Sequence, residues 1–371
     1  MTEDTTTMPN SNAVRLSGRQ WLLTAGILLA LIVAAPALWR HVESFRPGPD
    51  YRIPYELSSD YWLYRCYSDW AAAREKIAVI GDSVIWGHYV RPDATLSHYL
   101  NAATGSDRFV NLGLDGTHPA ALQGLIAHYA GSVAGRTVVL QFNPLWLTSE
   151  KHDLQTSKEF HFNHAKLVPQ FVPKIPCYRA SLSTRLWAVT ERHVPFFSWT
   201  SHLKIAYFEG NDLPGWTLQH PYDNPLARRA SLVPRSLHIE DRNVPRGMDD
   251  EERVTNLKST NVAWVTLDRS LQWRFFRRTI EQLRERDCRV FVLVGPLNEH
   301  MLDEQDAATY DRIKHGIETW LQTNDVPHLV APPLPVSLYA DFSHPLADGY
   351  AQLAAQLLQE PAFKSTVLAD L

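Results

Sequence analysis

The chain has 371 residues, of which 45% are hydrophobic, and this apolar content is enough to bury one large core or two average ones. Such a composition excludes a disordered chain. The formal net charge is −4, and no Lys/Arg-rich run or nucleic-acid motif is present, so nucleic acid is not expected as a partner. The three cysteines, Cys66, Cys177 and Cys288, are far apart and lack metal-ligand spacing, which leaves free thiols or one disulfide open.

An apolar run near the N-terminus is long enough to cross a membrane. No residue from Trp21 to Trp39 is charged, and a helix of this length spans a bilayer core of about 30 Å. We therefore expect a tail over residues 1–20 and a transmembrane anchor over residues 21–40, with a tryptophan near each interface. A signal peptide cleaved near Ala35 is the alternative. Arginines flank the run on both sides, so the positive charges do not determine the orientation of the helix. An extracytoplasmic (periplasmic) position for the bulk of the chain is therefore a hypothesis.

The pattern after the anchor predicts an α/β domain. Residues 41–75 lack clear periodicity and are interpreted as a juxtamembrane linker that ends in a short packed segment, and the domain is expected over residues 76–371. Short apolar runs alternate there with amphipathic segments, which predicts a mostly parallel five-stranded sheet covered by helices on both faces. The expected strands are residues 77–80, 108–112, 137–142, 289–294 and 328–330. The alternation breaks over residues 145–263, which are rich in Pro, Trp, Phe and His and are interpreted as an insertion.

The first apolar run, Ile77–Ile80, leads directly into Gly81-Asp82-Ser83. A buried strand that ends in a glycine turn places Ser83 at the carboxyl end of the sheet, where open α/β sheets bind ligands. Its backbone N–H would point into the cleft and can hold an anion there. Taken alone, the same residues can also form a helix N-cap without any catalytic role.

A second polar motif, Asp341-Phe342-Ser343-His344-Pro345, lies near the end of the chain. A carboxylate three residues before a histidine can accept one imidazole N–H and leave the other ring nitrogen to activate a serine. The alternative is surface capping in front of a helix that starts at the proline. The Gly-Asp-Ser turn on the first strand of the same sheet favours the catalytic interpretation.

With both motifs in hand, the chain resembles the SGNH (GDSL-type) hydrolase superfamily over residues 76–144 and 264–360. The resemblance implies a three-layer, doubly wound sandwich with a flavodoxin-like sheet. It makes Ser83 the nucleophile, His344 its base and Asp341 the acid that orients the base.

Two weaker motifs carry the rest of this resemblance. The segment from Asn111 to Thr117 looks like the block whose glycine donates a backbone N–H to the oxyanion hole, and Gly116 fits this role better than Gly113. Asn143 matches the asparagine of the third block, although the glycine and aspartate that normally flank it are absent. The implied oxyanion hole consists of the N–H groups of Ser83 and Gly116 and the side-chain amide of Asn143.

A tethered SGNH domain with a long aromatic insertion looks similar to extracytoplasmic acyltransferases of cell-envelope polysaccharides. The similarity implies an acyl-ester hydrolase or an O-acyltransferase, with O-acetyl transfer to carbohydrate through an acyl-Ser83 intermediate and without a cofactor. The implied partners are an acyl donor, a carbohydrate acceptor and a multispanning membrane acyltransferase. Trp187, Trp199 and Trp216 are candidates for stacking on sugar rings, with simple packing as the alternative.

The altered third block supports a different hypothesis, in which the chain is a non-catalytic SGNH-fold subunit that binds glycan or acts as a scaffold in a membrane acylation complex.

The histidines of the insertion and the residues after the fourth strand are two further candidates for a functional role. His152, His161 and His164 cluster in the insertion, but no cysteine or His-Glu-x-x-His pattern accompanies them, so no metal site is expected. Residues 295–298 follow the fourth strand and either line the cleft or simply end the strand.

Overall fold

The computed structural model describes residues 16–43, 45–224 and 262–369, and the chain divides into two compact units, Met1–Ser44 and Phe45–Leu371. In the first unit the described residues form α1 (Gly18–Val42), a helix of 25 residues whose N-terminus is closed by a capping box of Ser17 and Gln20. This helix is long and apolar enough to cross a membrane. It fits the expected anchor and also the alternative of a signal sequence. The tail before residue 16 lies outside the described residues.

The described residues of the second unit contain one sheet of five strands, all parallel. The strands are β1 (Ile77–Ile80), β2 (Phe109–Asn111), β3 (Thr137–Phe142), β4 (Arg289–Val294) and β5 (His328–Val330). The predicted parallel sheet is therefore confirmed. The strand order is β2-β1-β3-β4-β5, so the direction in which strands are added reverses at β1 and β3. Sheets with this order open a ligand-binding crevice at the carboxyl ends of those two strands.

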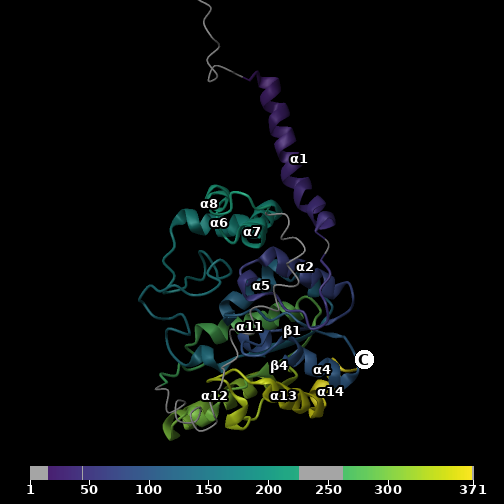
Figure 1. Cartoon of the computed structure of the whole chain (residues 1–371). Coiled ribbons are helices and arrows are strands. Elements are labelled where there is room, and N and C mark those ends of the chain that lie inside the picture. Colours follow the sequence, from purple (N-terminus) through teal and green to yellow (C-terminus); the bar gives the residue numbers. More distant parts are fainter. Residues whose placement is uncertain (1–15, 44, 225–261, 370–371) are drawn as a thin grey trace, which may run out of the picture. The chain divides into compact units, whose positions relative to one another are not determined.

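Helices cover both faces of the sheet (Figure 1). One face carries α4 (Leu96–Thr104), α13 (Ala347–Gln359) and α14 (Pro361–Val367). The other face carries α5 (Pro119–Tyr129) and α11 (Leu271–Arg284), and α12 (Glu304–Thr323) packs along α11. Short 3-10 helices lie in the connections: η2 (Tyr55–Leu57), η3 (Pro92–Ala94), η4 (Gly131–Val133), η5 (Pro144–Leu147), η7 (Glu299–Met301) and η8 (Val336–Leu338).

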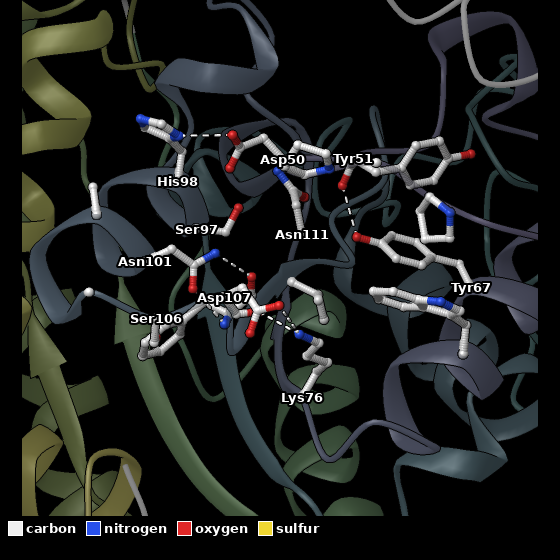
Figure 2. A pocket seen from close by; sticks show the side chains of 18 residues that line it. Asp50, Tyr51, Tyr67, Lys76, Ser97, His98, Asn101, Ser106, Asp107 and Asn111 are labelled. Atoms are coloured by element: carbon white, nitrogen blue, oxygen red, sulfur yellow. Dashed lines mark hydrogen bonds and ion pairs between the residues drawn. The ribbon is translucent and has the colours of Figure 1, made fainter.

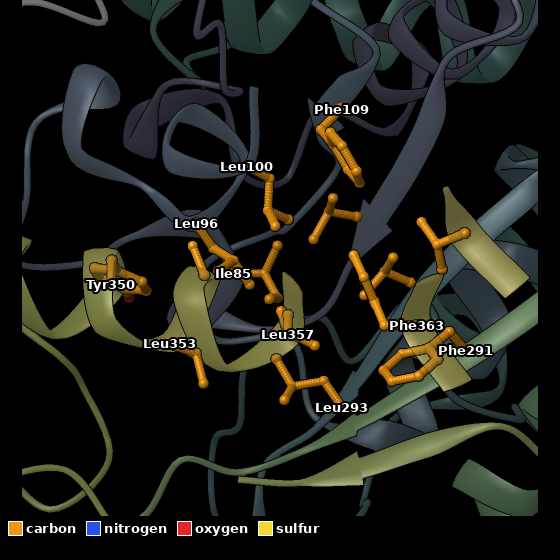
Figure 3. Close-up of a cluster of buried hydrophobic side chains, with 14 of the residues drawn as sticks. Ile85, Leu96, Leu100, Phe109, Phe291, Leu293, Tyr350, Leu353, Leu357 and Phe363 are labelled. Atoms are coloured by element: carbon orange, nitrogen blue, oxygen red, sulfur yellow. The ribbon is translucent and has the colours of Figure 1, made fainter. Parts of the chain in front are cut away.

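Alternating side chains of the strands fill two cores, one on each face of the sheet. Val139 and Phe291 are paired in register and belong to a buried cluster that includes Leu357 of α13 and Phe363 of α14 (Figure 3). The rings of Phe291 and Phe363 meet edge to face, with centroids 5.0 Å apart. On the opposite face Phe142 packs against two aromatic rings of α11. Both faces of the strands are thus buried, as their continuous apolar runs predicted.

Residues 45–75 belong to the second compact unit, so the packed segment that the sequence suggested at the end of the linker covers most of residues 41–75. They include α2 (Tyr61–Ala72), which begins at the N-cap Asp60 and is largely buried. The buried guanidinium of Arg52 donates to three backbone carbonyls, those of Trp86, Gly87 and Val90. The segment therefore supports the loop that follows the Gly-Asp-Ser turn. The buried residues of α2 include three tyrosines and a tryptophan next to Leu63, Ser68 and two alanines, without strong apolar periodicity, and this explains why the sequence pattern did not reveal a helix here.

The described part of the insertion belongs to the second unit; residues 148–181 form turns and loops, and three helices follow. Its helices are α6 (Leu182–His193), α7 (Pro195–Phe208) and α8 (Leu213–Gln219). His202 of α7 and Asp60 are both buried, and Nδ1 of the histidine lies 2.6 Å from a carboxylate oxygen. Trp216 is buried, so packing accounts for its ring, whereas Trp187 contacts Phe197 but is 45% exposed, and its role in stacking on sugar stays a prediction. Residues 225–261 of the insertion lie outside the described residues.

The three cysteines are free thiols. Cys177 and Cys288 are buried, and this burial raises the pKa of both thiols. The disulfide that the sequence left open is not formed.

Candidate active site

Ser83 is the first residue of α3 (Ser83–Trp86), a single helical turn that follows β1. Asp82 is the N-cap of this turn, and its Oδ1 accepts the N–H of Val84 at 2.9 Å. A Cβ at Gly81 would lie 2.7 Å from Oε1 of Gln141, so the tight turn has no room for a side chain there. The capping role that the sequence offered as an alternative thus belongs to Asp82, which leaves the hydroxyl of Ser83 for another partner.

The side chains of Ser83, His344 and Asp341 form one continuous hydrogen-bonded chain. Oγ of Ser83 lies 2.8 Å from Nε2 of His344, and Nδ1 of the same ring lies 2.8 Å from each carboxylate oxygen of Asp341. Because the carboxylate keeps a proton on Nδ1, Nε2 presents its lone pair to the serine hydroxyl. The two sequence motifs therefore meet as expected, and their role in catalysis stays a prediction.

The charges around the imidazole favour its protonated form. Burial lowers the pKa of His344, but the hydrogen bond and charge of Asp341, together with the charges of Asp82 and Asp115, outweigh it, so the pKa is raised. Burial also acts to raise the pKa of Asp341, and the hydrogen bonds and charge of His344 with two backbone N–H groups lower it to about 2. At neutral pH Asp341 is ionised, and His344 is the member of the chain that titrates.

Two of the expected oxyanion donors are free backbone N–H groups. Among the described residues, neither the N–H of Ser83 nor that of Gly116 has a hydrogen-bond partner. Gly116 has a φ of +70°, and a Cβ there would collide with the side chain of Asn163, so the position requires glycine. The N–H of Gly113 donates to Oδ1 of Asn111 at 3.0 Å. This bond removes the less favoured alternative for the donor.

Asn143 is buried and shares its amide with a carboxylate that the sequence analysis did not assign. Its Nδ2 donates to Oδ2 of Asp82 at 2.9 Å, and its Oδ1 accepts the N–H of Leu145 at 3.0 Å. Nε1 of Trp146 donates to the same oxygen of Asp82 at 2.8 Å. One amide hydrogen of Asn143 is therefore held by Asp82, and the second is left for an oxyanion. Burial raises the pKa of Asp82 although these donors oppose the shift.

A second histidine–carboxylate pair lies beside the first, and the sequence analysis missed it. Nδ1 of His88 lies 2.7 Å from Oδ1 of Asp115, and the ring centroids of His88 and His344 are 5.3 Å apart. The ring of Tyr89 lies 5.4 Å from that of His344. The available signal was position: His88 follows the serine turn closely, and Asp115 directly precedes Gly116.

The segment 295–298 supports the loop that carries Asp341. The backbone N–H of Asn298 donates to the carbonyl of Phe342 at 2.9 Å, and its side-chain amide lies 3.4 Å from the carbonyl of Asp341. These bonds tie the end of β4 to the loop of the second motif. The segment therefore has a positioning function for the site in addition to ending the strand.

Two of the three histidines that cluster in the insertion form hydrogen bonds with neighbouring groups. His164 engages both ring nitrogens, with the hydroxyl of Tyr61 at 3.0 Å and the carbonyl of Asp115 at 2.7 Å. Nδ1 of His152 lies 2.6 Å from the hydroxyl of Thr148. In the part of the chain that the structure describes, no three potential ligands from His, Cys, Asp and Glu are grouped for a metal ion.

A cavity of about 570 Å³ lies apart from the triad and is bordered by the edge strand β2 (Figure 2). Its charged groups pair with one another: Lys76 with Asp107 at 2.9 Å, and His98 with Asp50 at 3.0 Å. This cavity is not lined by Ser83, His344 or Asp341. It therefore offers no chemistry that adds to the site.

The fold and the site define an α/β protein with a Ser–His–Asp chain at the carboxyl edge of a parallel sheet. No family model matches this chain, and no curated protein matches it. The resemblance to the SGNH superfamily therefore rests on the sequence motifs and stays a prediction.

Proposed function

We propose that this protein is a serine-dependent acyl-ester hydrolase or O-acyltransferase of the SGNH type that forms an ester on Ser83. The observation that carries the proposal is the hydrogen-bonded chain from Asp341 through His344 to the hydroxyl of Ser83. A neutral imidazole at 2.8 Å from a serine hydroxyl is in reach to remove its proton. A helix cap or a structural hydrogen bond at Ser83 would require neither the buried imidazole of His344 nor the carboxylate of Asp341.

In this mechanism His344 Nε2 takes the proton of Ser83 while Oγ attacks the acyl carbonyl carbon. The developing oxyanion accepts hydrogen bonds from the N–H groups of Ser83 and Gly116 and from the second amide hydrogen of Asn143. The tetrahedral intermediate collapses, the bond to the leaving alcohol breaks, and His344 gives its proton to that alcohol. Water or an acceptor hydroxyl then attacks the Ser83 ester by the same steps in reverse order.

The setting of the site favours transfer to a cell-envelope carbohydrate. In the proposal α1 anchors the chain in the membrane, the second unit lies on the extracytoplasmic (periplasmic) side, and a multispanning membrane acyltransferase supplies the acyl group.

The experiment that tests this function incubates the full-length chain with p-nitrophenyl acetate, with and without a glycan acceptor. A burst of p-nitrophenol supports the acyl-enzyme. Acetylated glycan identifies a transferase and acetate alone an esterase, whereas a folded chain that gives no burst supports the glycan-binding or scaffold alternative.

Replacing Asn143 by alanine is expected to reduce turnover by about a hundredfold to a thousandfold, because one oxyanion donor is lost. The contact with Asp82 adds a second effect, since the variant leaves a buried carboxylate with one donor fewer. We therefore expect the free energy of unfolding to fall by about 1.5–3 kcal/mol. Steady-state kinetics and urea unfolding measure the two effects. Unchanged turnover would remove Asn143 from the oxyanion hole, whatever the effect on stability.

Activity is expected to fall as the pH decreases through the raised pKa of His344, because only the neutral imidazole accepts the proton of Ser83. The carboxylates of Asp341, Asp82 and Asp115 cause this raised pKa. Replacing Asp115 by asparagine removes one negative charge, which lowers the pKa of His344. The acid limb of the kcat/KM profile should therefore move to lower pH in this variant. A limb at the same pH would show that the charge of Asp115 does not act on the imidazole.

A further inference from the structure

We propose that His88, held by Asp115, binds a second hydroxyl group of the acceptor, so that the acyl group on Ser83 passes preferentially to an alcohol with two neighbouring hydroxyls. This inference rests on the proposed function and adds a residue that selects the acceptor. The two histidine–carboxylate pairs face one site, since their imidazole centroids are only 5.3 Å apart.

The hydrogen bond to Asp115 determines what His88 can offer. Its Nδ1 lies 2.7 Å from the carboxylate, so in the neutral ring the proton is on Nδ1 and Nε2 carries a lone pair. Within the described residues Nε2 has no hydrogen-bond partner, and the side chain is 26% exposed. A buried structural histidine normally uses both nitrogens, as His164 does. His88 therefore presents an unused acceptor beside the imidazole of His344.

The backbone of His88 places this acceptor close to the nucleophile. Its N–H donates to the carbonyl of Ser83 at 3.1 Å, because His88 follows the single turn that Ser83 begins. Once Ser83 is acylated, Nε2 of His344 is released from the serine hydroxyl and can accept the proton of an incoming alcohol. A neighbouring hydroxyl of the same alcohol then reaches Nε2 of His88, since each such bond spans about 2.8 Å.

A cavity next to Asp115 provides space for a larger acceptor. It has a volume of about 290 Å³ and is lined by Asp115, by Asn163 and by the aromatic ring of Tyr55, with Lys166 among its polar residues. The cavity is not lined by Ser83, His88, Gly116 or His344; its link to the expected oxyanion hole runs through Asp115 and through Asn163, whose side chain lies against Gly116. Polar groups around an aromatic ring suit a sugar, which carries neighbouring hydroxyls on an apolar ring face.

The transfer step is balanced without any further reactant. The attacking hydroxyl oxygen forms a bond to the acyl carbon, and its proton moves to Nε2 of His344. The bond between Oγ of Ser83 and the acyl carbon then breaks, and the proton moves from His344 to Oγ. His88 gives and takes no proton in this sequence; it accepts a hydrogen bond and positions the acceptor.

The test compares two alcohols of equal chain length as acceptors for the acetyl-enzyme of the full-length chain. p-Nitrophenyl acetate loads Ser83, and 1-propanol or 1,2-propanediol is added to accelerate turnover. For the wild type we expect a lower KM for the diol, and a preference of about tenfold over 1-propanol, which is the effect of one additional neutral hydrogen bond. Acylation is measured in every variant, and the preference is normalised to it.

Two replacements of His88 separate positioning from folding. In His88→Asn the amide nitrogen can replace Nδ1 on Asp115 while nothing replaces Nε2, so we expect the diol preference to disappear through a higher KM. In His88→Gln the longer side chain carries a polar group to the position of Nε2, so we expect part of the preference to return. If either the wild type lacks the preference or His88→Asn retains it, the proposal is overturned, even when the burst is normal.

The chain offers a matched control. The pair of His98 and Asp50 is of the same kind, with Nδ1 at 3.0 Å from the carboxylate and side-chain exposures of 29% and 21%, compared with 2.7 Å, 26% and 12% for His88 and Asp115. It lies in the separate cavity of Figure 2. His98→Asn should keep the diol preference, and its loss there would count against a local effect of His88. A wild type without any burst would instead contradict the proposed function itself.

Discussion

Replacing Ser83 by alanine is expected to lower kcat by about 10⁴-fold or more, because the acyl-enzyme path then has no nucleophile. Labelling by a serine-directed fluorophosphonate should also disappear. The fold should be unaffected: the only side-chain partner of the hydroxyl among the described residues is Nε2 of His344, and the N-cap bond of α3 comes from Asp82. Kinetics, labelling and the thermal midpoint are measured on the same preparation.

Ser97→Ala is the control for this experiment. Ser97 is also buried, and its hydroxyl has one side-chain partner, Oγ1 of Thr95 at 3.2 Å, in the cavity that lies apart from the triad. It should keep both activity and labelling. Persistent labelling of Ser83→Ala would identify a different nucleophile, and a folded wild type that is neither labelled nor active would leave the binding or scaffold alternative.

The sheet was predictable from the sequence because its strands are buried on both faces. Four of the five expected strands have the boundaries that the structure shows: residues 77–80, 137–142, 289–294 and 328–330. Continuous apolar runs between turn residues are local signals, and they can be recognised without knowledge of the tertiary contacts. The helix α2 was not predictable in this way, since its buried residues mix Tyr and Trp with small residues, and its aromatic rings pack against distant parts of the chain, as Tyr61 does against Tyr129.

In the candidate site, too, residues in local motifs were predictable and contacts between distant loops were not. Ser83 and His344 were found because each lies in a short motif with its own chemistry, and the parallel sheet brings the ends of distant segments to one edge. The partners of Asp82 could not be found, because the bond from Asn143 joins the loops after two different strands. The same holds for His88 and Asp115, which meet only when the loops after β1 and β2 are folded.

The structure also gives Asn143 a role that the sequence did not suggest. From the sequence, Asn143 was expected only as an oxyanion donor. Its bond to the buried carboxylate of Asp82 shows that the amide also satisfies a group whose burial raises its pKa. A side chain that serves the reaction and the interior at once links activity to stability, so both must be measured on any variant at this position.

Replacing Asp341 by asparagine is expected to lower kcat by about 10⁴-fold while the fold persists. In the wild type the carboxylate is ionised, with a pKa of about 2, and accepts Nδ1–H of His344 at 2.8 Å. An amide can donate to Nδ1, which places the ring proton on Nε2, where it can no longer accept the hydrogen of Ser83. The loss of the charge also lowers the pKa of His344, so the remaining activity should persist to lower pH.

The decisive measurement for Asp341→Asn is the pH profile of the remaining activity together with fluorophosphonate labelling of Ser83. We expect slow labelling whose acid limb lies below that of the wild type, since the largest favourable interaction of the imidazolium is gone. An acid limb at the wild-type position would show that Asp341 does not determine the protonation of His344. Undiminished kcat would show that the Ser83–His344 pair works without an orienting carboxylate, and the triad assignment would then be wrong.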